Sequence, residues 1–145
     1  MPPDIKEFQG DFRWLSNFWP AEVVLEEQAF PTVENAYQAA KVEKALRDPF
    51  ITCSPAFSKK LGRLQKLRED WEEVKISVMR DLISQKFCKG SRLSVELLAT
   101  EDAEIVEGNW WNDTFWGVCR GVGENTLGKL LMEQRAFLKE LNDAP

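Results

Sequence analysis

The sequence contains no histidine among its 145 residues. This absence excludes Ser-His-Asp and Cys-His catalysis, and it removes the commonest protein ligand of zinc and non-haem iron. Any chemistry must therefore come from carboxylates, lysine, tyrosine or hydroxyl groups. We accordingly expect a protein that needs neither a metal ion nor another cofactor.

Cysteine is also scarce. The three cysteines, Cys53, Cys88 and Cys119, are odd in number, lie far apart and form no CxxC pair. They indicate neither a disulfide framework nor a zinc site. Because the sequence shows no signal-peptide core and no long apolar run, we expect a cytoplasmic protein without membrane attachment.

Positive charge is in deficit, since the net charge is −5. Such a chain is poorly suited to a long electrostatic contact with duplex DNA, although a local basic pocket for one or two phosphates remains compatible with it. A basic cluster does occur over residues 59–68, which contain Lys59, Lys60, Arg63, Lys66 and Arg68. It is either a solvated helix face or a contact for phosphate or a nucleic-acid backbone.

Apolar residues make up 43% of the chain, enough for a core without disulfides or metals. The length predicts one domain over residues 1–145. Six tryptophans and nine phenylalanines indicate a core built on large rings, with one or two rings lining a pocket where they could stack on a flat base.

The pattern predicts an α+β fold, a single mainly α-helical domain with a small antiparallel β element near the N-terminus. Residues 5–30 show the spacing of short extended pieces, and residues 108–125 are typical of a loop. Helix signals predict helices over residues 32–46 with Thr32 as cap, from Ser54 to Gly62, over 71–87, over 91–98, and after a capping Asn125.

One face of the helix expected over residues 32–46 carries Glu34, Tyr37, Gln38 and Lys41, which stand at positions i, i+3, i+4 and i+7. Two interpretations are open. The face is a solvated surface ladder with a Glu–Lys pair, or it is a pocket wall whose carboxylate, phenol, amide and amine suit acid–base work on a sugar without histidine.

The loop around Asp113 places an acid between bulky rings and before Gly117. Desolvation by rings can raise the pKa of such an acid, and a ring such as Trp116 can stack on a base. The alternative is an Asx-type turn that tryptophans anchor to the core. A nearby glycine- and lysine-containing segment at residues 123–130 imitates a P-loop, but Leu130 stands where the magnesium-binding Ser or Thr should be.

Taken together, these segments resemble the NADAR family of riboflavin-biosynthesis-intermediate N-glycosidases. The resemblance holds in order from about residue 8 to residue 137. The matching segments are residues 15–20 (LSNFWP), 30–41 (FPTVENAYQAAK), Gly62-Arg63, Trp71, Lys75 with Met79, Lys86-Phe87, residues 112–117 (NDTFWG), residues 123–132 (GENTLGKLLM) and Arg135.

The resemblance implies hydrolysis of an N-glycosidic bond to ribose in a nucleotide-like small molecule. Family substrates include ribosylamino-pyrimidine phosphates of riboflavin synthesis, and other members remove ADP-ribose from guanine, which could lie within nucleic acid. Carried over by motif, the catalytic residues are Glu34, Lys41 and Asp113. The substrate-binding residues are Asn17, Phe18, Tyr37, Gln38, Arg63, Trp116 and Gly117.

The chain departs from the family pattern at two places. Asn35 stands where the family commonly has histidine, which argues against an essential role for that histidine. The hairpin reads Glu26-Glu27-Gln28 where the family often has glycine. Two rival functions share the same scaffold: a module that binds ADP-ribose or NAD without cutting it, and a protein-interaction domain.

Overall fold

In the computed structural model, which describes residues 2–144, three helices begin at capping hydroxyl groups. The side chains of Thr32, Ser54 and Ser91 each accept a hydrogen bond from the backbone N–H three residues further on. Such bonds satisfy N–H groups that have no partner within the helix. They begin the helices α1 (Val33–Ala40), α3 (Pro55–Arg63) and α5 (Arg92–Leu98), as the sequence predicts.

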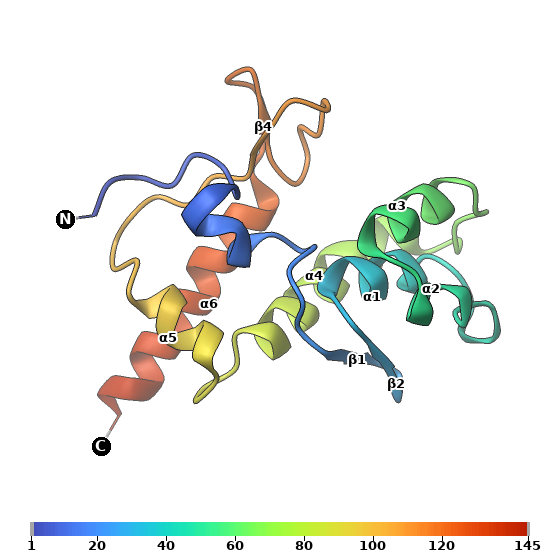
Figure 1. Cartoon of the computed structure of the whole chain (residues 1–145), viewed down its shortest axis with the longest axis horizontal. Coiled ribbons are helices and arrows are strands. Elements are labelled where there is room, and N and C mark those ends of the chain that lie inside the picture. Colours follow the sequence, from blue (N-terminus) through green and yellow to red (C-terminus); the bar gives the residue numbers. More distant parts are fainter. Residues whose placement is uncertain (1, 145) are drawn as a thin grey trace. The chain divides into compact units, whose positions relative to one another are not determined.

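The chain groups into two units, one of residues 17–86 and the other of residues 1–16 with 87–145. In the first unit, β1 (Val23–Leu25) and β2 (Gln28–Phe30) form an antiparallel hairpin. Helix α1 packs against this hairpin and against α2 (Pro49–Thr52), α3 and α4 (Trp71–Lys86) (Figure 1). All eight residues of α1 are buried, so this helix is the centre of its unit.

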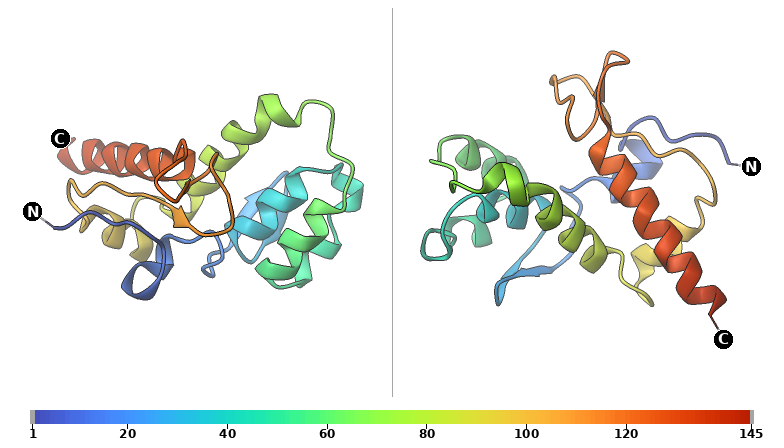
Figure 2. Two further views of the ribbon diagram at one scale, coloured as in Figure 1. Left: turned by 90° about the horizontal axis from the view of Figure 1, so that it is seen from above. Right: turned by 180° about the vertical axis from the view of Figure 1, so that it is seen from behind.

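In the second unit, α5 lies beside the long helix α6 (Thr126–Asp143), which Figure 2 shows from two further directions. Two short strands, β3 (Gly108–Asn109) and β4 (Val118–Cys119), pair in parallel. The N-terminal segment joins this unit through a parallel bridge between Ile5 and Ile105. Apolar side chains of α6, among them Leu127, Leu131 and Leu138, are buried as the helical spacing predicts.

The predicted fold class, α+β and mainly helical with a small antiparallel sheet near the N-terminus, is confirmed. The prediction for residues 5–30 was wrong in part, because Gly10–Leu15 form a 3-10 helix rather than extended backbone. Here the indole N–H of Trp14 donates to the carbonyl of Asp11 at 2.9 Å, a local contact across one turn of the 3-10 helix. Within residues 2–144, no helix is both long and apolar enough to cross a membrane.

One helix boundary also differs from the prediction. Helix α1 ends at Ala40 and not near Leu46, because its last turn tightens: the N–H of Lys41 bonds to Gln38 and the N–H of Val42 to Ala39. A separate 3-10 turn follows over Lys44–Leu46.

Asn125 does precede α6, but its side chain makes no capping bond to the helix and its φ is 54°. Instead its amide accepts a hydrogen bond from the N–H of Glu107 at 3.0 Å and donates one to the carbonyl of Ile105 at 2.9 Å. The side chain therefore joins the start of α6 to the segment that leads into β3.

Gly128 allows this close approach. A Cβ at this position would collide with the carbonyl oxygen of Ile105 and with the side chain of Asn125. Gly128 is therefore a close-packing position within α6.

We predict that Gly128→Ala destabilises the protein by about 1–3 kcal/mol, because overpacking outweighs the usual gain of about 1 kcal/mol for alanine in a helix. Thermal unfolding followed by circular dichroism measures the change. Lys129→Ala, at the neighbouring exposed position of α6, is the control and should leave the midpoint nearly unchanged. A Gly128→Ala variant as stable as the wild type would contradict the prediction.

Candidate functional site

The polar face of α1 is buried. Glu34, Tyr37 and Gln38 expose only 7%, 7% and 4% of their surface. The amide of Gln38 donates to the carboxylate of Glu34 across 3.3 Å. The interpretation of this face as a solvated surface ladder is therefore wrong, since polar groups are removed from water here at a considerable cost in free energy.

Lys41 lies at the C-terminal end of the same face and is half-buried. Its Nζ lies 5.4 Å from the centre of the Tyr37 ring, which in turn packs on Trp71 with ring centres 5.2 Å apart. Burial lowers the pKa of Lys41 below its ordinary value, while the nearby charge of Glu34 raises it. Burial is the larger effect, so the amine is easier to deprotonate than a lysine in water.

Three further cations surround Lys41 and lower its pKa: Arg63 and Lys59 from α3, and Lys75 from α4. Lys75 also pairs with Glu72. The basic cluster seen in the sequence is thus divided, because Arg68 turns to Asp70 instead, with 2.9 Å between Nη2 and Oδ2. Sequence reasoning assigned Arg63 to the site but missed Lys59 and Lys75, although the resemblance already included Lys75.

Helix α3 approaches this face at a glycine. A Cβ on Gly62 would overlap the side-chain oxygen of Gln38, so the two helices meet closely only without a side chain here. Within residues 2–144, the side-chain oxygens of Gln38 and Ser58 are buried and have no hydrogen-bond partner. Buried polar groups are normally paired, so these two oxygens are exceptions where α3 meets the polar face of α1.

Asn17 and Phe18 precede the hairpin in the same unit. The carbonyl oxygen of Asn17 accepts the N–H of Glu34 at 3.0 Å, which fixes the start of α1. The amide of Asn17 points to the sulfur of Met79 across 3.6 Å, and the Phe18 ring is 38% exposed. Asn17 therefore lies at the backbone of Glu34, and Phe18 presents a ring to solvent.

Asn35 has a structural role. It is fully buried, and its amide donates to the carbonyls of Phe50 and Cys53 at 2.8 and 2.9 Å. Its oxygen accepts the hydroxyl of Thr32 at 2.5 Å. These bonds occupy both ends of the amide, so Asn35 ties α1 to α2 and the residues after it.

Asp113, Trp116 and Gly117 belong to the other unit, that of residues 1–16 and 87–145. Asp113 Oδ1 accepts the N–H groups of Phe115 and Trp116 at 3.2 and 2.9 Å, which is the Asx-type turn offered as the alternative. The Phe115 and Trp116 rings meet edge to face, 4.8 Å apart. A Cβ on Gly117 would strike the Glu107 carboxylate. Asp113 therefore has a structural role in this turn, and its catalytic role stays a prediction.

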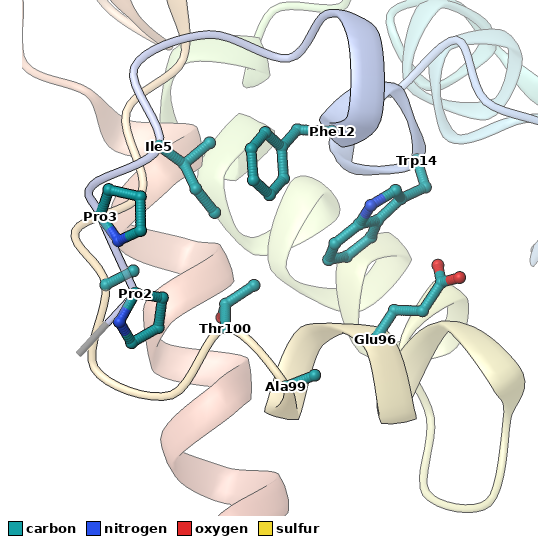
Figure 3. Close-up of a pocket in the computed structure, with 9 residues that line it drawn as sticks. Pro2, Pro3, Ile5, Phe12, Trp14, Glu96, Ala99 and Thr100 are labelled. Carbon is teal, nitrogen blue, oxygen red and sulfur yellow. The ribbon is translucent and has the colours of Figure 1, made fainter.

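An apolar cavity of about 260 Å³ also lies in this second unit, shown in Figure 3. It contains none of the predicted site residues; its lining is Pro2, Pro3, Ile5, Phe12, Trp14, Glu96, Ala99, Thr100 and Ala103. Among residues 2–144, no group of three or more cysteine or acidic side chains is arranged to hold a metal ion. The face of α1 is therefore the candidate active site.

Comparison with known proteins gives a consistent result. The family model of the NADAR domain matches residues 5–139. N-glycosidase YbiA of Shigella sonnei is 41% identical over 136 residues, which are 89% of this chain and 81% of that protein. A riboflavin biosynthesis protein of Vibrio vulnificus is 35% identical over 88% of this chain, but the match spans only 36% of that longer protein.

Among solved structures, the NMR structure of the E. coli protein YbiA is similar, with a TM-score of 0.85 and 34% identity. The match covers 100% of this chain and 91% of that one.

We predict that Glu34→Gln lowers the pKa of Lys41 further, because the variant removes a nearby negative charge that raises it. Trace acetylation of Lys41 across a range of pH, read by mass spectrometry, should therefore show its midpoint at lower pH than in the wild type. Glu43→Gln is the control, because it removes the same kind of charge at an exposed position just after α1. A midpoint that rises in Glu34→Gln would show that the two groups do not interact as described.

Proposed function

Because this chain belongs to the NADAR domain family, we propose that it hydrolyses the ribose C1–N bond of a nucleotide-like substrate, either ADP-ribosylated guanine or a ribosylamino-pyrimidine phosphate. The predicted enzyme class, an N-glycosidase, is confirmed by the names of relatives at about 41% identity. The observation that carries the finer proposal is the burial of Glu34 on the same helix face as the half-buried Lys41.

The reaction sets the demands on the site. When the C1–N bond breaks, its electron pair leaves with the nitrogen, which takes up a proton, and positive charge develops on the ribose. A carboxylate close to C1 stabilises that charge and can accept the proton of an attacking water. Glu34 suits this role because its environment is largely shielded from water, where a fixed charge acts most strongly.

Lys41 allows a second route. Its neutral amine can attack C1, displace the nitrogen of the base with the bonding electron pair, and open the ribose to an imine that water then hydrolyses. The amine must be deprotonated for this step, and burial favours the neutral form. In this proposal Lys41 is the nucleophile and Glu34 the neighbouring acid–base group.

Cations and polar groups around Lys41 fit an anionic substrate. Arg63 and Lys59 lie near enough to influence the Lys41 amine, and they offer positive charge to a phosphate. Tyr37 and Gln38 line the same face, while Asn17 and Phe18 belong to the same unit, and we assign all four to substrate binding. Asp113 as a catalytic acid, and Trp116 with Gly117 as binding residues, keep their proposed roles on the motif match alone.

The assay that tests the function is chromatography of the products after incubation with each substrate class. We expect release of guanine-containing product from ADP-ribosylated guanosine, or of free base from ribosylamino-pyrimidine phosphate. Glu34→Gln and Asp113→Asn should each lower kcat by about 100-fold or more, the range of acid–base catalysis. Both changes keep shape, and in Asp113→Asn the new amide oxygen could still accept the N–H groups of the turn.

Glu43→Gln is the matched control for the carboxylates, since Glu43 is exposed beside the same helix. Binding of both substrates without any turnover would overturn the proposal and support a module that only binds ADP-ribose or NAD. Near wild-type kcat in either carboxylate variant would remove that residue from the catalytic set.

The covalent route has its own test. If Lys41 attacks C1, borohydride added during turnover should reduce the imine and leave a ribose-derived adduct on Lys41, detected by peptide mass spectrometry. Lys41→Arg should form no adduct and should lose activity, whereas Lys44→Arg, an exposed neighbour, should behave like the wild type. Absence of an adduct together with full activity of Lys41→Arg would assign the attack to water.

A further inference from the structure

We propose that Arg47 is a positioning residue that holds the C-terminal end of α1, and with it Lys41, in the arrangement the site requires. The side chain of Arg47 is 2% exposed, which is rare for an arginine. It comes from the segment between the 3-10 turn of Lys44–Leu46 and helix α2. A buried guanidinium needs hydrogen-bond acceptors, and the structure shows which groups provide them.

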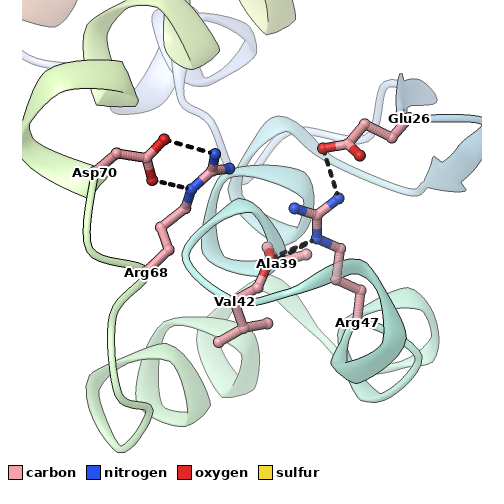
Figure 4. A network of polar contacts seen from close by, with 6 residues as sticks. All are labelled: Glu26, Ala39, Val42, Arg47, Arg68 and Asp70. Carbon is pink, nitrogen blue, oxygen red and sulfur yellow. Dashed lines mark hydrogen bonds and ion pairs between the residues drawn. The ribbon is translucent and has the colours of Figure 1, made fainter.

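The acceptors lie on both sides of Lys41 in the chain. Arg47 Nε donates to the carbonyl of Ala39 at 3.0 Å and to the carbonyl of Val42 at 3.1 Å (Figure 4). The last carbonyls of a helix have no partner within it, and a cation at this end also interacts favourably with the helix dipole. Arg47 therefore fixes the backbone immediately before and after Lys41.

The outer end of the guanidinium is held by Glu26, whose Oε1 lies 3.1 Å from Arg47 Nη1. Glu26 and Glu27 form the turn of the β1–β2 hairpin with φ values of 46° and 72°, a left-handed conformation that glycine adopts more easily. The hairpin turn thus supplies the carboxylate that pairs with Arg47. This contact joins the hairpin to the end of α1.

A backbone hydrogen bond holds the carbonyl of Lys41 itself. The backbone N–H of Arg68 donates to the carbonyl of Lys41 at 2.9 Å, while the Arg68 side chain turns away to Asp70 (Figure 4). Substitution of Arg68 removes its side chain and keeps this backbone bond. Arg68 is therefore a matched control arginine, near Lys41 in space but without a side-chain role in holding α1.

The groups that face the Lys41 amine are Glu34 and Tyr37 on α1, Lys59 and Arg63 on α3, and Lys75 on α4. If the end of α1 loosens, Lys41 gains access to water, and the burial that lowers its pKa is reduced. The pKa of Lys41 then moves upward, toward its ordinary value. A general loss of stability would unfold the protein without this specific change at Lys41.

The test measures Lys41 directly by trace acetylation across pH and peptide mass spectrometry, in Arg47→Met, Arg47→Lys and Arg68→Met. Circular dichroism establishes that each variant is folded. We expect the labelling midpoint of Lys41 to move to higher pH in Arg47→Met, to move less in Arg47→Lys, and to stay unchanged in Arg68→Met. A folded Arg47→Met with the wild-type midpoint would overturn the proposal.

Because removal of a buried arginine can prevent folding, Glu26→Ala provides a second variant. Its carboxylate side chain is 55% exposed, so the fold should tolerate the change. The Lys41 midpoint should move in the same direction as in Arg47→Met, by a smaller amount. An unchanged midpoint in Glu26→Ala, when Arg47→Met fails to fold and Arg47→Lys matches the wild type, would equally overturn the proposal.

The effect on turnover rests on the proposed function, whereas the labelling result does not. If Lys41 acts in catalysis, Arg47→Met should lower kcat by about tenfold or more with a smaller change in KM, because the reactive group is misplaced. Raising the pH should restore part of the rate. A shifted labelling midpoint with unchanged kcat would retain Arg47 as a positioning residue and remove Lys41 from the catalytic set.

Discussion

Burial of a polar helix face is the constraint on which the unit of residues 17–86 depends. Helix α1 is surrounded by the hairpin and by α2, α3 and α4, yet it carries Glu34 and Gln38 into that interior. A carboxylate out of water is costly unless partners offset the cost. The surrounding elements are arranged accordingly. Gly62 allows α3 to come close, and the carbonyl of Asn17 accepts the N–H of Glu34.

The two ends of α1 are held by different contacts. At the N-terminus, the Thr32 hydroxyl accepts the N–H of Asn35, and the Asn35 amide donates to a backbone carbonyl of α2. These bonds fix the first turn, which carries Glu34. At the C-terminus, the carbonyls of Ala39 and Val42 accept a buried guanidinium, and the carbonyl of Lys41 accepts a backbone N–H. Burial and three nearby cations favour its neutral form, and Glu34 opposes them. Their balance sets how readily the amine loses its proton.

The sequence alone predicted several helix starts and the polar face of α1. Hydroxyl caps marked three helix starts, and the i, i+3, i+4, i+7 spacing placed the polar face of α1 correctly. The sequence could not tell whether that face was solvated, because periodicity identifies a shared side of a helix and not its neighbours. The role of Arg47 was equally hidden, since its partners lie 5, 8 and 21 residues away and depend on how the chain folds back. Asn125 imitated a cap because its bonds to Glu107 and Ile105 span the chain.

The absence of histidine limits which groups in this chain can titrate near neutral pH. Asn35, which follows Glu34, is fully buried and bonds through both ends of its amide to fixed partners, so it stabilises the first turn of α1 without titrating. With no imidazole available, a group that gains or loses a proton near neutral pH has to be made from a carboxylate or an amine whose pKa is altered by its surroundings. Burial moves the pKa of Lys41 in this direction, below its ordinary value. Accordingly, the packing that encloses the end of α1 favours the neutral amine of Lys41 over the charged form.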